Sequence, residues 1–357
     1  MNRRREYRMT GSPCAPLDAF YRRRRNVNPV VCVDRLFCVF RPAAIFATMA
    51  GFATMAGRST GVVSDMRMTL LRLSLFFAAL FALSACSPLT ILNAMISEDG
   101  FTVRSGIRFG PDVRHALDVY VPKRRSGPLP VVVFFYGGNW RGGERADYLF
   151  AADALTSRGY VAIVPDYRLF PDVRFPAFVE DGAKAVRWVL AHVADFGGDP
   201  DRLYLMGHSA GAHIAAMLTL DESYLAAVGV PGNRIRGTIV LAGPYAFTPS
   251  RTASVAPIFA HLADENAARP IVFVDGDEAP MLLLHGEDDD TVFVFNTADL
   301  AKAVRDAGGS ARHIIYPDVG HLGILFALAR PFRGIAPVLS DAAAFIDSQR
   351  SPAAVAQ

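Results

Sequence analysis

The sequence predicts an α/β fold built on a doubly wound, mostly parallel sheet. Two observations point to it. From residue 101 onward, short apolar runs typical of buried strands alternate with stretches of helical periodicity, which is the β-α-β order of such sheets. One strand-to-helix junction carries the pattern G-x-S-x-G at Gly207–Gly211, with an apolar run before it and a small, helix-compatible segment after it.

The expected elements begin with an antiparallel entry pair of strands at 101–109 and 116–121. A fully buried strand follows at 130–136, because its apolar run is continuous rather than alternating. Catalytic groups in such sheets emerge at the carboxyl ends of the strands. Further strands are expected at 160–165, 203–206, 237–241, 281–285 and 312–316, and helices at 146–158, 177–196, 210–220, 295–307 and about 338–348.

Segment 244–279 interrupts this alternation and is long for a simple connection between two strands. We expect it to form a small cap or pocket wall over the site. Four of its apolar residues could line an acyl or alcohol pocket, or could equally pack in the core: Phe247, Ile258, Phe259 and Phe273.

The charge of the chain is unevenly distributed. Residues 1–65 contain eleven arginines and four acidic residues, a balance of +7, and Arg67 and Arg72 add two more positive charges. Because the whole chain has a formal net charge of +3, these nine charges leave residues 86–357 at −6. A mildly acidic domain lacks the basic patch that nucleic-acid binding requires, so no nucleic-acid partner is expected.

Residues 66–85 resemble a lipoprotein signal peptide. Two arginines precede an eleven-residue apolar run at 73–83, and Leu83-Ser-Ala-Cys86 resembles the lipobox, in which a lipid is attached to the cysteine. An ordinary cleaved signal peptide is the alternative. Lipid attachment at Cys86 would anchor the protein in a bacterial envelope, facing the periplasm, and Ser87 fits sorting to the outer membrane.

The signal leaves residues 1–65 as an upstream extension, such as a misassigned start codon would produce, or as a disordered basic arm that binds nucleic acid. In the first case, translation begins at Met66 or Met68. Residues 86–100 are then expected to be a linker and 101–349 the folded domain.

All four cysteines, Cys14, Cys32, Cys38 and Cys86, precede the folded domain, which therefore contains no disulfide. The sequence has no C-x-x-C or H-E-x-x-H motif, and the three adjacent aspartates at 288–290 lack the glycine and the spaced ligands of a calcium loop. We expect neither a metal nor a cofactor.

Ser209 is the candidate nucleophile. In a G-x-S-x-G turn the serine lies between a strand and the N-terminus of a helix, where backbone N–H groups favour a developing negative charge. Gly207 and Gly211 are needed because a Cβ at either position would clash with the neighbouring strand and helix.

The serine hydroxyl needs a base, which is normally histidine. His321 is the candidate, because it lies in the glycine-bracketed loop Pro317–Gly323 directly after the last predicted strand. The side chains of His208 and His213 are expected to point away from the serine, and His285 is expected to position the loop of the catalytic acid. The other histidines are expected to be structural or have no supporting context: His115, His192, His261 and His313.

The base in turn needs a carboxylate that orients it. The spacing His-Gly-x-x-Asp-x-x-Val from residue 285 to residue 292 selects Asp289, with Asp288 and Asp290 as alternatives. For the oxyanion, we expect backbone N–H groups at Gly137, Gly138 or Asn139 to act with that of Ala210. The chain order serine, aspartate, histidine is that of the α/β-hydrolase fold.

These motifs together resemble the carboxylesterases of the α/β-hydrolase fold, in the branch of the hormone-sensitive lipases and feruloyl esterases, over residues 101–349. This sequence departs from the family pattern at Tyr136, because those esterases usually have histidine before the two glycines. It is carried by six segments in the same order: Tyr136-Gly-Gly, Pro165-Asp-Tyr-Arg-Leu169, Gly197-Gly-Asp-Pro200, Gly207-His-Ser-Ala-Gly211, His285-Gly-Glu-Asp-Asp289 and Gly320-His321. Of these, Asp166, Tyr167 and Arg168 are expected to be structural.

The resemblance implies a serine hydrolase that cleaves small or medium carboxylic esters through an acyl-enzyme. Two alternatives stay open. A peptidase or amidase could use the same triad, although the related oligopeptidases usually carry an N-terminal propeller, for which residues 86–100 leave no room. A lipoprotein that binds a ligand without catalysis is the other, and the filled triad positions disfavour it.

Overall fold

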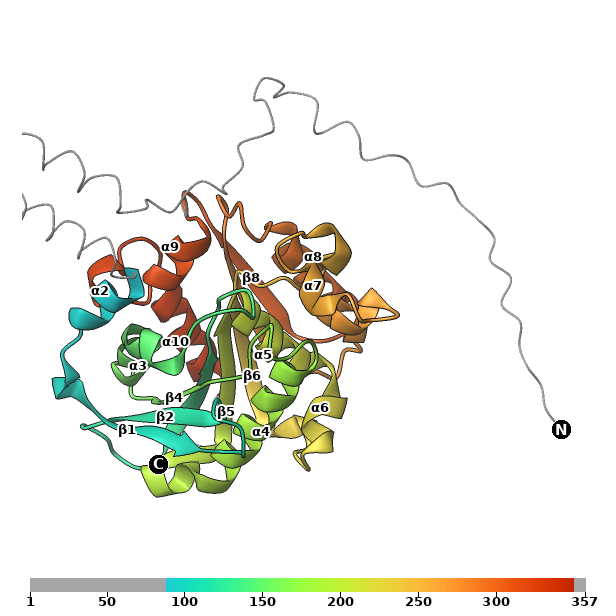
Figure 1. The fold of residues 1–357 in the computed structure, drawn as a ribbon. Helices are drawn as coiled ribbons and strands as arrows, with labels where there is room; N and C mark the ends of the chain where they lie inside the picture. The colour runs from blue at the N-terminus through green and yellow to red at the C-terminus, as the bar shows by residue number, and fades with distance from the viewer. Residues whose placement is uncertain (1–87, 350–357) are drawn as a thin grey trace, which may run out of the picture. The chain divides into compact units, whose positions relative to one another are not determined.

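The computed structural model describes residues 88–349 (Figure 1). Eight strands form one sheet in the order β1-β2-β4-β3-β5-β6-β7-β8. The pairs β1–β2 and β2–β4 are antiparallel, and all other neighbours pair in parallel. The predicted doubly wound, mostly parallel sheet is thus confirmed. The strands are Phe101–Arg108 (β1), Ala116–Pro122 (β2), Leu129–Phe135 (β3), Val161–Pro165 (β4), Gly198–His208 (β5), Ile235–Leu241 (β6), Met281–Gly286 (β7) and Ala311–Tyr316 (β8).

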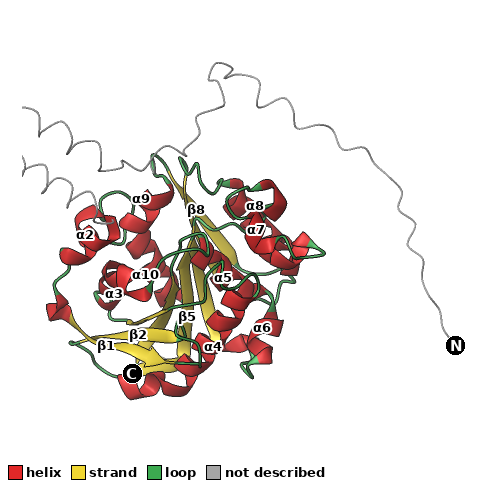
Figure 2. Ribbon diagram, viewed as in Figure 1, coloured by secondary structure: helices red, strands yellow, loops and turns green. Residues whose placement is uncertain are grey.

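Helices cover both faces of the sheet (Figures 1 and 2). Leu149–Thr156 (α3) and Val338–Ser348 (α10) lie on one face, while Ala177–His192 (α4), Ala210–Leu220 (α5) and Phe295–Asp306 (α8) lie on the other. This division follows from right-handed crossovers: the chain steps one way from β3 to β4 and the other way from β4 onward. Smaller helices are Pro88–Ala94 (α2), Glu222–Ala227 (α6), Ala256–Phe259 (α7) and His321–Phe326 (α9).

The core lies between the central strands and these helices. Every residue of β2, β3, β4 and β7 is buried, and the uninterrupted apolar runs of β3 and β4 are what is expected of strands covered on both faces. Most residues of β1 and β8, at the two edges of the sheet, are exposed or half-buried. Apolar side chains alone therefore identify the centre of the sheet.

Several elements differ from their predicted limits. The helix expected at 146–158 is a 3-10 turn, Arg145–Tyr148 (η3), followed by α3, and the helix expected at 177–196 becomes 3-10 after His192. Strand β5 begins five residues before the predicted strand at 203–206, because Gly198 pairs with Leu129 of β3. These extensions depend on backbone pairing, which apolar patterns do not report.

Two connecting regions carry more structure than expected. The described part of the expected linker 86–100 contains α2 and a 3-10 turn, Glu98–Gly100 (η2), and Leu92 of α2 is buried. Segment 244–279 forms a series of short turns around α7. Its Phe247 lines a cavity beside Ser209, whereas Ile258 and Phe259 are buried in the core and Phe273 packs against it.

The predicted extension 1–65, the predicted signal at 66–85 and Cys86 lie outside the described residues. Within residues 88–349, none of the helices has the length and apolar character needed to span a bilayer.

Candidate active site

The candidate site forms at the carboxyl ends of four strands in the parallel part of the sheet. Ser209 follows β5 directly, and the predicted oxyanion residues Gly137–Asn139 follow β3. Asp289 follows β7, and His321 follows β8. Because the carboxyl ends of parallel strands share one edge of a sheet, these residues meet although up to 184 positions separate them along the chain.

Ser209 has a strained backbone, with φ 55° and ψ −120°. The N–H of Ser209 donates to the carbonyl of Leu241 on β6 over 2.9 Å, which helps to hold this conformation. A Cβ on Gly207 would lie 2.3 Å from the carbonyl oxygen of Gly211, and one on Gly211 would lie 2.0 Å from that of Phe135. Both glycines of the motif are therefore required by close backbone approach.

His321 connects the serine to the acid. Its Nε2 lies 3.0 Å from Oγ of Ser209, and its Nδ1 lies 2.7 Å from Oδ2 of Asp289. Since a carboxylate only accepts, Nδ1 carries the proton, and Nε2 is free to accept from the serine hydroxyl. The structure thus brings together the three residues predicted from the sequence.

Asp289 is the acid that the geometry selects. Its Oδ1 accepts from the backbone N–H groups of Thr291 and Val292 over 2.9 and 2.8 Å. Its Oδ2 also lies 3.1 Å from Nε2 of His285. Burial alone would raise the pKa of Asp289, but the hydrogen bonds from His285 and His321 outweigh it and hold the pKa well below its usual range. The alternatives Asp288 and Asp290 are exposed.

His285 has the supporting position expected of it. Its Nε2 lies 2.7 Å from the carbonyl oxygen of Val292 as well as close to Asp289, and both partners accept. Nε2 therefore carries a proton, and Nδ1 lies 2.7 Å from the hydroxyl of Thr297 on α8. The ring of His285 therefore holds the loop that carries Asp289 against strand β7.

His208 differs from its expected orientation. Its ring lies against the ring of His321, with 4.8 Å between centroids, and its Nε2 donates to the carbonyl oxygen of His321 over 3.0 Å. Burial, followed by the charge of His321, lowers the pKa of His208 to about 3. A neutral ring therefore connects the serine turn to the loop of the base. His213 does point away from the site, to the carbonyl oxygen of Ala268.

The predicted oxyanion residues lie beside the serine. A Cβ on Gly137 would come within 3.1 Å of the Ser209 Cβ, and Gly138 and Asn139 have φ values of 128° and 53°. Within residues 88–349, no protein acceptor binds the N–H of Gly138, Asn139 or Ala210. The N–H groups of Gly137, Gly138 or Asn139, acting with that of Ala210, therefore remain the predicted donors of the oxyanion hole.

The side chain of Tyr136 supports the loop that carries the predicted oxyanion donors. Its ring stacks between those of Tyr148 and Tyr167, with centroid distances of 5.1 and 4.7 Å. Its hydroxyl donates to Oδ1 of Asp166 and accepts from Arg114, both over 2.8 Å. Burial, and then the charge of Asp166, raise the pKa of Tyr136 well above its usual value, so that the phenol keeps the proton it donates.

Arg114 and Tyr167 complete the support. Arg114 also donates to the carbonyl oxygen of Gly143, at the far end of the loop, over 2.7 Å. The hydroxyl of Tyr167 donates to the carbonyl oxygen of Tyr136 over 2.7 Å. The sequence marked Asp166 and Tyr167 as structural, which agrees with these contacts, but no local pattern singled out Arg114.

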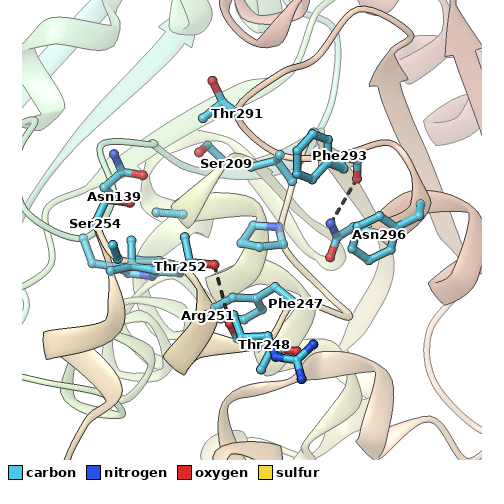
Figure 3. Close-up of a pocket in the computed structure, with 17 residues that line it drawn as sticks. Asn139, Ser209, Phe247, Thr248, Arg251, Thr252, Ser254, Thr291, Phe293 and Asn296 are labelled. Carbon is cyan, nitrogen blue, oxygen red and sulfur yellow. Dashed lines mark hydrogen bonds between the residues drawn. The ribbon is translucent and has the colours of Figure 1, made fainter. Parts of the chain in front are cut away.

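Two cavities meet at Ser209, and both are lined by Asn139, Ser209 and Thr291. The larger one, about 640 Å³, extends toward Phe247 and Arg251 in segment 244–279. Figure 3 shows Ser209 on the opposite side of this cavity from Thr248 and Arg251.

The smaller cavity, about 320 Å³, contains His321 in its wall. Its apolar lining includes Leu89 of α2 together with Leu322, Leu325 and Phe326 of α9. In the part of the chain that the structure describes, no group of three or more histidine, cysteine or acidic side chains is arranged to hold a metal ion.

Comparisons with known proteins find similar hydrolases. Residues 117–228 match the BD-FAE family model, and residues 177–348 match that of the prolyl oligopeptidase family. The chain is 29% identical over 262 residues to the probable isoprenylcysteine alpha-carbonyl methylesterase ICMEL1 of Arabidopsis thaliana, covering 65% of this chain and 53% of that protein. It is 30% identical over 263 residues to esterase LipQ of Mycobacterium tuberculosis, covering 66% and 61%.

The chain therefore spans little more than half the length of the first of these relatives. Among solved structures, esterase B from Lactobacillus rhamnosis matches with a TM-score of 0.64 at 20% identity, over 80% of this chain and 96% of that one. A likeness at this identity shows the fold. The chain has the α/β-hydrolase fold and is similar in sequence to proteins named as esterases.

Proposed function

We propose that the chain is a serine carboxylic ester hydrolase. The observation that carries the proposal is the continuous hydrogen-bonded line from Oγ of Ser209 through the ring of His321 to Asp289. This arrangement is the one that makes a serine hydroxyl nucleophilic near neutral pH.

The reaction follows from the geometry. As Oγ of Ser209 bonds to the ester carbonyl carbon, its proton passes to Nε2 of His321, and the oxyanion accepts from the N–H groups of Gly138, Asn139 and Ala210. The carbon–alkoxy bond then breaks, and His321 returns the proton to the leaving alcohol. Water repeats the sequence on the acyl-enzyme and releases the acid. None of these steps requires a cofactor.

The two cavities divide the substrate between them. The leaving oxygen must lie near Nε2 of His321, and only the smaller of these two cavities has His321 in its wall. The alcohol therefore occupies the smaller cavity. The acyl group extends along Asn139, Ala210 and Trp140 into the larger one. A large acid and a small alcohol are what the name of the methylesterase relative describes for that protein.

The peptidase alternative has one specific observation in its favour, which is the match of residues 177–348 to the prolyl oligopeptidase family model. The names of the relatives favour esters. A comparison of ester with aminoacyl-amide substrates of the same acyl group separates the two, and faster cleavage of the amide would favour a peptidase.

The proposal includes a lipid anchor. The lipobox-like Leu83-Ser-Ala-Cys86 supports attachment at Cys86 to a bacterial envelope membrane, with the hydrolase facing the periplasm. The mass of the N-terminal peptide of the native product tests this: a diacylated Cys86 is expected, and peptides from residues 1–60 would contradict it.

Ser209→Ala tests the catalytic proposal. We expect it to abolish cleavage of short p-nitrophenyl esters, by about 10⁶-fold in kcat, and to abolish labelling by a fluorophosphonate probe. Ser223→Ala, at an exposed serine on α6, is the matched control and should keep the wild-type rate. Near-wild-type activity of Ser209→Ala would reject the assignment, and a folded wild-type protein that neither labels nor cleaves would favour a binding lipoprotein.

A further inference from the structure

Helix α2 fixes where the chain leaves the folded domain. Leu92 on one side of it is buried, and Asn93 makes two hydrogen bonds to the segment that opens α3: its amide donates to the carbonyl oxygen of Ala146 over 2.8 Å and accepts from the N–H of Phe150 over 3.1 Å. A buried leucine and a doubly bonded amide hold this short helix in one orientation. The direction in which its other side chains face is therefore set by the fold.

Two large apolar side chains, one on α2 and one directly after it, are exposed. Ile91 and Met95, four residues apart, are 48% and 56% exposed. Leu89 of α2 shares the wall of the smaller cavity with Leu322 of α9, which is 53% exposed. Figure 1 shows the two helices beside each other.

Apolar exposure continues past α9. Ile335 is 42% exposed and lies near Gly323 of α9, and Phe332 is 39% exposed and contacts the ring of Phe326. Contiguous exposed apolar side chains mark an interaction surface rather than ordinary solvent exposure. We call the following set the apolar rim: the exposed Ile91, Met95, Leu322, Phe332 and Ile335, together with the half-buried Leu89.

The sequence identifies what covers the rim. Only Ser87 lies between Cys86 and the first residue of α2, and a two-residue step spans at most about 7 Å. A lipid on Cys86 would therefore hold the start of α2 at the membrane surface, without a flexible linker that would let the domain turn away. Exposed aliphatic and aromatic side chains are what an interfacial surface inserts among lipids.

We propose that the apolar rim docks on the membrane that anchors Cys86, so that the smaller cavity beside Ser209 and His321 opens toward the lipid. This inference rests on the lipid anchor proposed above. It adds the orientation of the domain on the membrane and the route by which the substrate enters the site. Esters dissolved in the bilayer enter the site from the membrane side. The alcohol part of such a substrate meets the lipid-facing cavity first.

A fluorescence experiment tests the orientation without any catalysis. The full lipid-modified chain carrying Ile91→Trp is reconstituted in phosphatidylcholine vesicles that contain brominated acyl chains. We expect quenching of the added tryptophan beyond the wild-type signal of Trp140 and Trp188. Val113→Trp, at an apolar position on the β1–β2 connection that is 82% exposed, is the control and should show no added quenching.

Vesicle-bound protein in which Ile91→Trp is not quenched, or is quenched no more than Val113→Trp, would overturn the orientation. Protein that does not bind vesicles would overturn it as well, since the anchor would be absent. Neither result touches ester hydrolysis, which the soluble assay of Ser209→Ala decides separately.

An activity assay tests the route. The double variant Ile91→Glu and Met95→Glu changes two rim residues that line neither cavity beside Ser209. We expect it to lower the cleavage of a vesicle-embedded ester about tenfold, because charged side chains resist insertion at the interface, and to leave the rate on a water-soluble p-nitrophenyl ester unchanged. Val113→Glu should change neither rate. An equal loss on both substrates, or on neither, would contradict the proposal.

Discussion

The two sides of Ser209 are organised by different means. On the triad side, His321 contacts both the serine and Asp289 directly, and the supporting rings of His208 and His285 come from the ends of β5 and β7. On the oxyanion side, the predicted donors are backbone groups, and the side chain of Tyr136 supports their loop.

The two sides therefore depend on side-chain identity to different degrees. The triad requires particular functional groups at particular atoms, so each substitution removes a chemical step. The oxyanion loop requires only that its backbone keep a strained path, with positive φ at Gly138 and Asn139. Many contacts share that task, so single losses there should be smaller.

The largest effect is expected on the triad side. Asp289→Ala removes the group that orients His321, and we expect kcat to fall about 10⁴-fold with little change in fold. Asp290→Ala, at the exposed neighbour, is the control and should stay within about twofold. Equal losses in both variants, measured with p-nitrophenyl butyrate, would show that the acid has been misassigned.

A smaller effect is expected on the oxyanion side. Tyr136→Phe keeps the stacked ring but removes the hydroxyl between Asp166 and Arg114. We expect kcat to fall about tenfold with KM nearly unchanged, less than the 10²-fold or greater loss of a donor itself. Tyr316→Phe removes a similar hydrogen bond, to Asp341 on α10 rather than to the oxyanion loop, and should not affect kcat. A fall in kcat as large as that of Asp289→Ala would contradict the expected difference between the two sides.

The two cavities give a third test, of selectivity. Thr252 lines the larger cavity and Leu322 the smaller, and both are exposed, so tryptophan at either position should not disturb folding. We expect Thr252→Trp to lower kcat/KM about tenfold for octanoate relative to acetate esters of one alcohol. Leu322→Trp should instead lower kcat/KM for esters of large alcohols relative to small ones with the same acid. The rate of deacylation, which follows loss of the alcohol, should not change. The opposite pattern would reverse the assignment of the cavities.

The smallest effect concerns stability alone. His213 packs edge-on to Trp140 of the oxyanion loop, and burial lowers its pKa to about 4. Between pH 6.5 and 4 the unfolded state binds more protons at this site than the folded state, so stability falls as the pH falls through that window.

His213→Gln keeps a donor for the carbonyl oxygen of Ala268 and cannot titrate. We expect the loss of unfolding free energy between pH 7 and pH 5 to shrink by about 2 kcal/mol in this variant. Urea unfolding at both pH values measures it, and an unchanged difference would mean that His213 is already protonated in the folded protein.

The residues that the sequence identified are those whose type is tied to a motif. Ser209, Asp289 and His321 were each located by glycines or by spacing at the end of a predicted strand, because strand ends are visible in apolar patterns. Arg114 could not be found in this way, since its contacts with Tyr136 and Gly143 join three separate segments.

The orientation of His208 was missed for a related reason. Its neighbour in the sequence is Ser209, but its contact is His321, 113 positions away. Helix α2 was also missed, because seven residues are too few for a clear helical period and its place is set by packing on α3.

The ring of His208 has one further consequence. His208 precedes Ser209 in the chain, and its ring is hydrogen-bonded to the backbone of His321. It therefore connects the nucleophile to its base. When the loops around the site fluctuate, the two reacting atoms should shift together rather than apart. A mildly acidic medium should not break this hydrogen bond, since burial lowers the pKa of His208 to about 3 and a proton added at Nδ1 would leave the Nε2 donor in place.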